Sequence, residues 1–508
     1  MTRVQDWLLW RSIVSPHQLA LEFGSVQWSY EELQERVSNL SGLLLSWGVQ
    51  KGNRIGMLLN ASDICIATVH ALARIGAITV PLNVRQSSSE LLWQLIHCDP
   101  SLILYDPTLS DLKKRIEEER KDRTFRWKRS TELRTDTNHK PVKGESMNTA
   151  SLHSIIYTSG STGTPKGVEI TFSNLLWHAI SFGIRHGASS SDRWLVVLPL
   201  FHVGGYAIIF RSVLHGSSII LHPGFEAANV AESLDRDRIT LVSFVPTMLA
   251  RVLKLHRKPF SPDLRLIFLG GSQTPRSLLR VILKRRLPVV LTYGMTETCS
   301  QVANSPVDYL ADLDENSYRT MFPTTLAIGS GEVMVSQPRK VGEILIRGPT
   351  LFRGYWRNPK VTSAALKDGW FHTGDLGFLD AQGGIVVLGR KDDMMISGGE
   401  NIYPSDVESS LRQHEAIEDV VVIGREDRRW GQRVEAVVKV KQDFNPPSAS
   451  KLTKFLRERI GGYKIPKVYH FWASIPKTRS GKARRDVVRE LVERGEEWQE
   501  RKEGTKSK

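Results

Sequence analysis

Residues 157–167 read YTSGSTGTPKG, and no other stretch of the chain says more about its fold. Its three glycines and five Ser/Thr hydroxyls follow Ser154-Ile155-Ile156, an apolar lead-in that predicts a strand. Glycine lets the backbone approach an anion, and successive N–H groups and hydroxyls can surround phosphate oxygens. The stretch therefore predicts a phosphate-binding loop at the end of a strand. A purely structural Ser/Gly turn is the alternative for the loop taken alone.

The lysine of this loop separates it from the nucleotide loop of kinases and P-loop NTPases. A Walker A loop reads G-x-x-x-x-G-K-[ST], and its last hydroxyl binds magnesium. Here Lys166 follows Pro165 and precedes Gly167, so that hydroxyl is missing. Pro165 also removes a backbone donor next to the lysine. The Walker interpretation is excluded.

Length and cysteine content set the broad class of the protein. The chain has 508 residues, which exceeds one compact core and predicts two or more domains. The three cysteines, Cys65, Cys98 and Cys299, are far apart and form no CxxC pair. This spacing argues against a disulfide framework or a zinc knuckle, and it predicts a cytoplasmic protein.

No segment reads as a signal peptide or a membrane span. The first residues, MTRVQDWLLW, lack a continuous apolar core with a small-residue cleavage site. The longest apolar region, residues 64–82, is interrupted by His70 and Arg74. A transmembrane helix needs roughly 20 consecutive apolar residues, so we predict no stable membrane insertion.

The formal net charge of +15 raises the possibility of a polyanion partner. Much of the excess comes from residues 111–146, where Glu and Asp alternate with Lys and Arg. This pattern favours a solvated helix and loop, and no RNP, zinc-finger or helix-turn-helix signature is present. We therefore predict no nucleic-acid partner and keep a non-catalytic basic binding protein as the rival class. Anionic small molecules would suit the charge equally well.

Helical and strand patterns alternate through most of the chain and predict an α/β fold with a mostly parallel sheet. Residues 29–49 have helical spacing, with Ser29 as the expected N-cap, and residues 63–76 form a second helical segment. The predicted strands of this part lie at residues 54–60, 77–83, 101–106, 194–200, 217–223, 239–245, 264–271 and 288–294.

The pattern changes near residue 341. Residues 341–348, 383–390 and 435–441 read as short strands with Gly-rich turns, as in a smaller α+β unit. We place a domain junction at GRKDD (389–393), which divides the chain into domains of residues 1–391 and 392–508.

YTSGSTGTPKG resembles the signature of the acyl-adenylate-forming superfamily, which includes acyl-CoA ligases, luciferases and peptide-synthetase adenylation domains. Further motifs of that superfamily follow in the same order, from residue 29 to residue 485. The resemblance implies a large N-terminal domain of mixed or parallel sheets flanked by helices, and a small mobile α+β C-terminal domain. It assigns the ATP phosphates to Thr158, Ser159, Gly160, Ser161, Thr162, Gly163, Thr164 and Lys166.

Two motifs resemble the walls of the superfamily's nucleotide pocket. In YGMTETCSQ (293–301), Tyr293 would stack on adenine, Thr296 would contact the α-phosphate and Glu297 would hold Mg²⁺. An aromatic face supports stacking, and a carboxylate near a hydroxyl can share a metal-bound phosphate. LGGSQTP (269–275) resembles the opposite wall. Further nucleotide contacts implied by the two motifs are Gly294, Met295, Gly270, Gly271 and Ser272.

Two more motifs resemble the ribose site and the hinge. In GWFHTGDLGFLD (369–380), Asp375 would accept from the ribose hydroxyls, as carboxylates do in dinucleotide sites. In GRKDDMMISGGENIYPSDVE (389–408), Arg390 would add a ribose contact and Asp392 would be the hinge. Gly398 and Gly399 would line the pantetheine tunnel.

PKTRSGKARRD (476–486) resembles the motif that carries the catalytic lysine, here Lys482. Its ammonium could bridge the substrate carboxylate and the α-phosphate as charge moves between them. The neighbouring cations are predicted to be solvated surface charges: Lys477, Arg479, Arg484 and Arg485.

Within the superfamily, LPLFHVGG (198–205) and TETCSQ resemble the o-succinylbenzoate–CoA ligases of menaquinone and phylloquinone biosynthesis. His202 would lie beside the acyl pocket and act in catalysis, and Ser300 and Gln301 would donate to a polar acid. Ligases for a benzoate, a cinnamate or a fatty acid are the alternatives, and His202 could equally be a packed structural histidine.

The resemblance implies two half-reactions, with ATP, Mg²⁺ and coenzyme A as cofactors and a small carboxylic acid as substrate. The carboxylate first attacks the α-phosphate to give an acyl-adenylate and pyrophosphate. The small domain then turns about Asp392, and the CoA thiol attacks the mixed anhydride. The sequence leaves the oligomeric state open.

Overall fold

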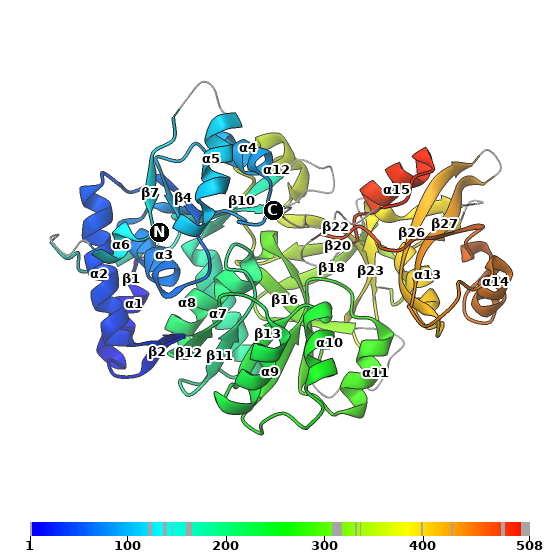
Figure 1. The fold of residues 1–508 in the computed structure, drawn as a ribbon, viewed down its shortest axis with the longest axis horizontal. Coiled ribbons are helices and arrows are strands. Elements are labelled where there is room, and N and C mark those ends of the chain that lie inside the picture. Colours follow the sequence, from blue (N-terminus) through cyan, green and yellow to red (C-terminus); the bar gives the residue numbers. More distant parts are fainter. Residues whose placement is uncertain are drawn as a thin grey trace, which may run out of the picture.

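A large α/β body is followed by a smaller C-terminal part, which extends to the right in Figure 1. The architecture is taken from a computed structural model. It describes residues 3–119, 124–135, 140–144, 146–158, 165–306, 317–330, 333–335, 337–397, 400–427, 430–478 and 483–498.

The first large sheet carries the hairpin around the predicted phosphate loop. Its six described strands follow the order β10 (Lys166–Thr171), β9 (Leu152–Thr158), β5 (Ile78–Pro81), β4 (Arg54–Leu58), β6 (Leu102–Tyr105) and β7 (Trp127–Arg129). All neighbours are parallel except β10 and β9, which are antiparallel. The predicted strands at 54–60, 77–83 and 101–106 are confirmed within one or two residues.

Helices precede, connect and follow these strands. They are α2 (Tyr30–Ser46), α3 (Asp63–Ile75), α4 (Ser88–Cys98), α5 (Ser110–Glu119) and α6 (Glu132–Thr135). Of these, α3, α4 and α5 form the crossovers between parallel strands of the sheet. Ser29 caps α2 as predicted, and it forms a capping box with Glu32.

The second large sheet contains fifteen strands in the described part of the chain. From one end its order is β3 (Val26–Ser29), β2 (Leu19–Phe23), β12 (Ser218–Leu221), β11 (Arg193–Val196), β13 (Leu241–Phe244), β14 (Leu266–Leu269), β15 (Val289–Met295), β16 (Ser300–Asn304), β17 (Ser317–Thr320), β23 (Ile385–Arg390), β22 (Trp370–Leu379), β20 (Gly342–Arg347), β18 (Thr325–Ser330) and β19 (Val333–Val335), with β21 (Leu366–Lys367) beside β22. The run from β12 to β15 is parallel and the strands from β15 to β19 are antiparallel.

This topology corrects one expectation. The strands at 341–348 and 383–390 read as part of the smaller unit, but β20 and β23 belong to the long sheet. They extend the parallel core as antiparallel strands joined by short turns, which local sequence cannot distinguish from a separate small sheet. In chain order, the last strand of the long sheet, β23, ends at Arg390, and the next strand begins at Met395.

The remaining helices of the large body cover the two sheets (Figure 1). They are α1 (Trp7–Val14), α7 (Phe172–His186), α8 (Val203–His215), α9 (Ala227–Arg236), α10 (Pro246–Leu255), α11 (Arg276–Lys284) and α12 (Pro359–Ala365), with a small sheet of β1 (Arg3–Gln5) and β8 (Ser146–Asn148). No helix in the described ranges is long and apolar enough to cross a bilayer.

The C-terminal part is a small sheet with apolar layers on both faces. Its elements are β24 (Met395–Ser397), β25 (Glu400–Ile402), α13 (Pro404–Leu411), β26 (Ile417–Asp427), β27 (Gly431–Val440), α14 (Ala449–Arg457), β28 (Val468–Phe471) and α15 (Arg485–Arg494). Alternate residues of β26 point to opposite faces. Val420 and Val422 pack in one apolar cluster, and Val421 and Ile423 pack in the other.

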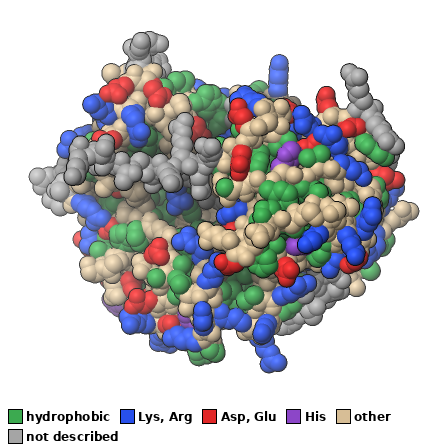
Figure 2. Space-filling view, turned by 45° about the vertical axis from the view of Figure 1, so that its right-hand side comes forward, with side chains coloured by type: hydrophobic (Ala, Val, Ile, Leu, Met, Phe, Trp, Pro, Cys, Tyr) green, Lys and Arg blue, Asp and Glu red, His purple; other side chains and the backbone are tan. Residues whose placement is uncertain are grey.

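The charge excess is spread over the surface. On the face in Figure 2, Lys and Arg side chains are scattered among acidic and apolar side chains. Lys113 and Lys114 of α5 pair with Glu117 and Glu118, one helical turn further on. The described part of residues 111–146 thus includes the solvated helix that the alternating charges predicted.

The N-terminal helix depends on a buried ion pair. Asp6 Oδ1 accepts hydrogen bonds from the backbone N–H groups of Leu8 and Leu9. Its Oδ2 lies 2.8 Å from Arg74 Nε, and the two side chains are 7% and 2% exposed. Removing one partner of a buried pair leaves the other charge without compensation.

We expect Asp6→Ala to lower the free energy of unfolding by about 3–5 kcal/mol, because Arg74 loses its carboxylate and α1 loses its cap. Asp6→Asn keeps a capping oxygen, so the difference between the two variants measures the cap. Lys114→Ala, which breaks an exposed pair, should change stability by less than about 0.5 kcal/mol. Urea titration measures all three. Equal effects of Asp6→Ala and Lys114→Ala would contradict the assigned role.

Candidate active site

The predicted phosphate loop joins the antiparallel strands β9 and β10 at the edge of the six-stranded sheet. Thr158 and Lys166 are cross-strand partners at the base of the loop, where Thr158 Oγ1 lies 3.5 Å from the Lys166 carbonyl oxygen. Lys166 Nζ lies 5.3 Å from the centroid of the Tyr355 ring. The remaining predicted loop residues lie outside the described part: Ser159, Gly160, Ser161, Thr162, Gly163 and Thr164.

Tyr293, Asp375 and Arg390 meet at the carboxyl end of β15. The Tyr293 hydroxyl donates to Asp375 Oδ2 at 2.8 Å, and Arg390 Nε lies 2.9 Å from Asp375 Oδ1. Asp375 and Arg390 are cross-strand partners in β22 and β23, which fixes their pairing. Burial, followed by the charge of Asp375, raises the pKa of Tyr293 well above 10. Tyr293 therefore remains a neutral donor.

Arg390 also lies within electrostatic reach of the predicted metal ligand. Burial lowers the pKa of Arg390, but the charges of Asp375 and Glu297 outweigh burial and raise the pKa above its ordinary value. The residues that the sequence predicted to bind ribose and metal thus lie in one cluster. Their individual contacts to a nucleotide stay predictions.

The turn after β15 presents Thr296 and Glu297 from a short 3-10 helix, Thr296–Thr298. Thr298, which sequence analysis did not single out, organises this turn. Its Oγ1 accepts from Met295 N at 2.9 Å and donates to the Ser300 carbonyl oxygen at 2.6 Å. Buried hydroxyls at turns satisfy backbone groups that the strand no longer pairs.

The next two residues have strained backbones. Cys299 and Ser300 have φ angles of 55° and 92°, in the left-handed region that non-glycine residues seldom adopt. Such strain typically costs about 1–3 kcal/mol per residue and persists only where the surroundings impose it. Here Thr298 and the pairing of β15 with β16 impose it, so the backbone of Ser300 is held beside Glu297.

Two of the predicted glycines are required by packing within the protein. A Cβ at position 270 would lie 2.0 Å from Thr292 Oγ1, and one at position 294 would lie 2.1 Å from the Ser300 carbonyl oxygen. Their small size lets β14, β15 and β16 approach closely. Gly271 and Ser272 follow β14, at the same edge of the sheet as Tyr293.

The residues predicted for the acid differ in exposure. His202 precedes α8 and is exposed, with its ring centroid 4.8 Å from that of Phe201. Ser300 is partly buried, and Gln301 is 9% exposed. Gln301 Nε2 has no hydrogen-bond partner among the described residues. It can therefore donate to a polar ligand.

Arg211 is a buried cation that sequence analysis missed. It is 3% exposed and lies over the rings of Phe182 and Trp194, at 4.3 and 4.1 Å from their centroids. Its Nε has no hydrogen-bond partner, and no carboxylate pairs with it among the described residues. A single charge within the apolar helix VGGYAIIFRSVLH was the signal that could have identified it.

The surroundings of Arg211 connect it to the predicted acid site. Burial raises the pKa of Cys299 to about 12 and the charge of Arg211 opposes this, so the guanidinium lies near the strained turn. Burial lowers the pKa of Arg211 to about 9, and it remains a cation at neutral pH. Burial, and next the cations nearby, lowers the pKa of His186 to about 3 and that of His215 to about 4. These histidines are neutral, and Arg211 is a buried cation that acts on both of them.

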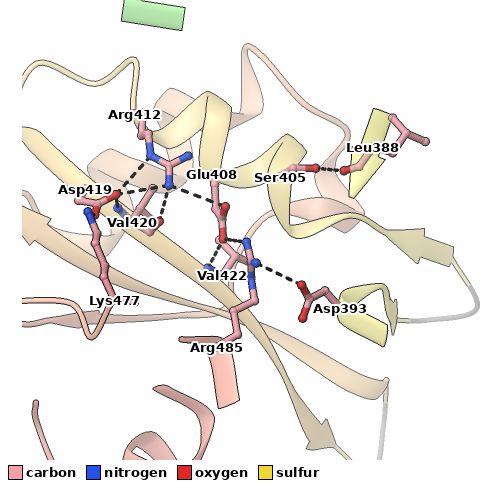
Figure 3. Close-up of polar contacts among 10 residues, drawn as sticks. All are labelled: Leu388, Asp393, Ser405, Glu408, Arg412, Asp419, Val420, Val422, Lys477 and Arg485. Atoms are coloured by element: carbon pink, nitrogen blue, oxygen red, sulfur yellow. Dashed lines mark hydrogen bonds and ion pairs between the residues drawn. The ribbon is translucent and has the colours of Figure 1, made fainter. Parts of the chain in front are cut away.

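Ion pairs fix both sides of the predicted catalytic-lysine motif in the C-terminal part (Figure 3). Lys477 Nζ lies 2.5 Å from Asp419 Oδ2, and Arg485 contacts Glu408 at 2.6 Å and Asp393 at 3.2 Å. Lys477 and Ala483 form an isolated antiparallel bridge. Lys482 itself lies outside the described residues, as do Gly398 and Gly399.

These pairs correct the expectation of a solvated basic run. Arg485 and Lys477 are ion-paired to α13 and β26, although Arg484 pairs only with exposed Asp486, as a surface cation would. Burial raises the pKa of Asp419, but Arg412 and Lys477 outweigh it and hold the pKa below 3.8. The acidic partners Asp419, Glu408 and Asp393 lie about 60–90 positions earlier in the chain, so no local pattern could reveal them. Arg479 lies outside the described residues.

The predicted hinge lies in a short connection between the two parts. Asp392 belongs to a 3-10 helix, Lys391–Asp393, which joins β23 of the long sheet to β24 of the small one. A cleft of about 180 Å³ separates α11 from the end of α13. The two parts are thus in contact through few elements near the connection.

The chain matches known proteins over nearly its whole length. Residues 10–356 match the model of the AMP-binding enzyme family, and residues 406–482 match the model of the AMP-binding enzyme C-terminal domain. The chain belongs to the AMP-binding enzyme family. The family and the fold class predicted from the sequence are confirmed.

Two relatives of similar length are both 2-succinylbenzoate–CoA ligases. The 2-succinylbenzoate–CoA ligase of Bacillus licheniformis is 35% identical over 481 residues, which cover 94% of this chain and 98% of that protein. The 2-succinylbenzoate–CoA ligase of Listeria monocytogenes is 33% identical over 485 residues, covering 96% and 99%.

Solved structures of o-succinylbenzoate CoA synthetase from Bacillus subtilis also superpose well. Its complex with the acyl-adenylate intermediate gives a TM-score of 0.90 at 32% identity, covering 98% of this chain and 100% of that chain. A double mutant of the same enzyme bound with its product analogue OSB-NCoA gives 0.74 at 33% identity, covering 96% and 99%. The arrangement of this chain is therefore closer to that of the acyl-adenylate complex.

We expect Arg485→Ala to lower the free energy of unfolding by about 2–4 kcal/mol, because it removes the 2.6 Å ion pair of the buried Glu408 carboxylate and leaves that carboxylate with the longer, 3.8 Å contact to Arg412. The matched control is Arg484→Ala, which removes an exposed pair and should cost less than about 1 kcal/mol. Thermal and urea unfolding of both variants measure the difference. Similar losses in the two variants would show that the Arg485 pair is not structural.

Proposed function

We propose that this chain is an AMP-forming acid–CoA ligase that converts 2-succinylbenzoate, ATP and CoA to 2-succinylbenzoyl-CoA, AMP and pyrophosphate. This agrees with the function expected from the sequence motifs. The curated relatives and the family match support the reaction. The single observation that carries the substrate is the buried, unpaired Arg211 beside the strained turn.

A buried cation without a carboxylate implies that an anionic ligand supplies one. In the proposed substrate one carboxylate reacts, and the second is free to pair with Arg211. Phe182 and Trp194 present aromatic faces around the guanidinium, and Gln301 Nε2 is free to donate. An aromatic dicarboxylic acid fits this lining better than a fatty acid does, since a fatty acid would leave the charge buried and unpaired.

In the first half-reaction, the acid carboxylate oxygen forms a bond to the α-phosphorus. The bond from that phosphorus to the bridging oxygen breaks, and pyrophosphate leaves with the electron pair. Thr158, Lys166 and the loop between them are proposed to hold the terminal phosphates, and Thr296 the α-phosphate. Tyr293, Asp375 and Arg390 are proposed to hold the nucleoside. Lys482 would stabilise the charge as it moves from carboxylate to phosphate.

Glu297 is suited to be a ligand of Mg²⁺. Its Oε1 accepts from Tyr355, and its Oε2 has no partner among the described residues. Carboxylate and hydroxyl oxygens are the hard ligands that Mg²⁺ prefers, together with water and substrate phosphates. No set of three or more His, Cys, Asp or Glu side chains converges anywhere in the described ranges as an all-protein metal site would. When bound, Mg²⁺ would neutralise charge on the triphosphate.

ATP, Mg²⁺ and CoA are the cofactors of this activity, and B. subtilis o-succinylbenzoate CoA synthetase has been solved with ATP and magnesium.

For the second half-reaction, we propose that domain 392–508 turns about Asp392 against domain 1–391. The thiol of CoA loses its proton and attacks the acyl carbon, and AMP leaves with the electrons of the broken C–O bond. The unequal match to two complexes of one B. subtilis enzyme supports such a movement. Gly398 and Gly399 are proposed to line the path of the pantetheine arm. His202, at the start of α8, is proposed to border the acid.

We propose a cytoplasmic location, since all three cysteines are unpaired and buried. The match to an enzyme family over most of the chain favours the ligase over a non-catalytic basic binding protein. The rival class is therefore not supported.

A pyrophosphate-release assay with a panel of acids tests the substrate. We expect kcat/KM for 2-succinylbenzoate to exceed that for benzoate, cinnamate or a fatty acid by about 100-fold or more, because only the second carboxylate pairs with Arg211. Arg211→Met should lower kcat/KM for 2-succinylbenzoate by about 100-fold and leave that for benzoate nearly unchanged. A higher rate with a monocarboxylic acid would overturn the assignment.

Asp392→Pro tests the hinge, since proline restricts the backbone rotation at that position. We expect the adenylation rate to stay within about threefold of wild type while thioester formation falls by about 100-fold. Adenylation is measured by pyrophosphate exchange, and thioester formation by CoA consumption from preformed acyl-adenylate. Lys482→Ala is the reciprocal control and should mainly slow adenylation. Equal losses in both half-reactions of Asp392→Pro would argue against a hinge.

A further inference from the structure

We propose that Tyr355 is a positioning residue that sets the distance between the metal-binding carboxylate of Glu297 and the ammonium of Lys166. Its hydroxyl donates a hydrogen bond to Glu297, and its ring contacts the ammonium of Lys166. One side chain therefore contacts both the proposed metal ligand and a proposed phosphate ligand. This inference rests on the proposed function for the roles of Glu297 and Lys166. Neither the sequence motifs nor the matched relatives assign a role to Tyr355.

The backbone around Tyr355 ties two parts of the site together. Phe352 N donates to the Glu297 carbonyl oxygen at 2.8 Å, which attaches the segment to the metal turn. Trp356 N donates to the Gly167 carbonyl oxygen at 2.7 Å, which attaches it to the strand leaving the phosphate loop. Tyr355 forms an antiparallel bridge with Val168 between these two points. The position of Tyr355 relative to both elements is therefore fixed.

The hydroxyl of Tyr355 orients the Glu297 carboxylate. It donates to Glu297 Oε1 at 3.0 Å, and Tyr355 is 8% exposed. Burial, and next the charge of Glu297, raises the pKa of Tyr355, so it stays a neutral donor throughout the physiological range. With Oε1 occupied, Glu297 presents Oε2 to a cation in one orientation. A carboxylate held by one hydrogen bond loses less rotational freedom when it binds a metal.

The ring of Tyr355 orients Lys166. The ammonium lies 5.3 Å from the ring centroid, within the range of a cation–π contact. The ring is itself held by Phe352, whose centroid is 4.8 Å away. Lysine is a flexible point charge, so a contact of this kind restricts where its ammonium rests. The hydroxyl and the ring thus have separable effects.

A packed structural tyrosine would give different results from a positioning tyrosine. If Tyr355 only fills space, removing its hydroxyl would not change the Mg²⁺ requirement. Tyr318 is a matched control, because burial also raises its pKa and its hydroxyl contacts neither Glu297 nor Lys166.

The test measures binding of a non-hydrolysable ATP analogue by calorimetry at a series of Mg²⁺ concentrations, with no acid or CoA present. Tyr355→Phe keeps the ring, and we expect it to raise the Mg²⁺ concentration for half-maximal binding about tenfold. Tyr318→Phe should leave that concentration unchanged. Tyr355→Leu also removes the ring and should weaken analogue binding by a further fivefold or so at saturating Mg²⁺.

Double variants separate the two effects. The losses of analogue affinity caused by Lys166→Met and Tyr355→Phe should add in the double variant, because Tyr355→Phe keeps the ring. The losses caused by Lys166→Met and Tyr355→Leu should not add, because each substitution removes the same contact between the ammonium and the ring. An unchanged Mg²⁺ requirement in folded Tyr355→Phe overturns the proposal. If the Mg²⁺ shift appears but 2-succinylbenzoate releases no pyrophosphate, the inference about Tyr355 stands and the proposed substrate fails.

Discussion

The arrangement of the site depends on two interactions of the Asp375 carboxylate. This carboxylate accepts from Tyr293 at the end of the parallel strands and pairs with Arg390, the last residue of the long sheet. These contacts connect three distant pieces of chain at one point. Because Arg390 immediately precedes the connection to the C-terminal part, the same carboxylate fixes where that connection begins. The site and the boundary between the two parts are therefore one structural unit.

Several features of the fold follow from sequence alone because they depend on local chemistry. Strands such as β4 and β5 are short apolar runs between turn residues, and Ser29 begins a helix with a glutamate in the capping position. Glycines at 270 and 294 were predicted as nucleotide contacts, and in the structure both positions are required by the close packing of neighbouring strands. Local patterns were sufficient in these places.

Long-range partners account for what the sequence did not reveal. Arg485 and Lys477 look like solvated cations until Glu408 and Asp419 are placed beside them. Strands β20 and β23 look like a separate small unit until their neighbours in the long sheet are known. Arg211 and Tyr355 belong to stretches that are otherwise apolar or turn-like, and their importance arises from contacts with other elements. A single sequence holds no record of such contacts.

The strained pair Cys299–Ser300 limits how the acid preference of this fold can change. Cys299 lies near the guanidinium that we assign to the substrate and Ser300 follows it in the same turn, so both are natural positions at which to alter the pocket. Their left-handed backbones, however, disfavour β-branched and bulky side chains and accept mainly glycine, asparagine or aspartate. Enlarging or reshaping the pocket from this turn is therefore restricted. New acids would have to be accommodated by changes on α7 and α8, where the backbone imposes no such limit.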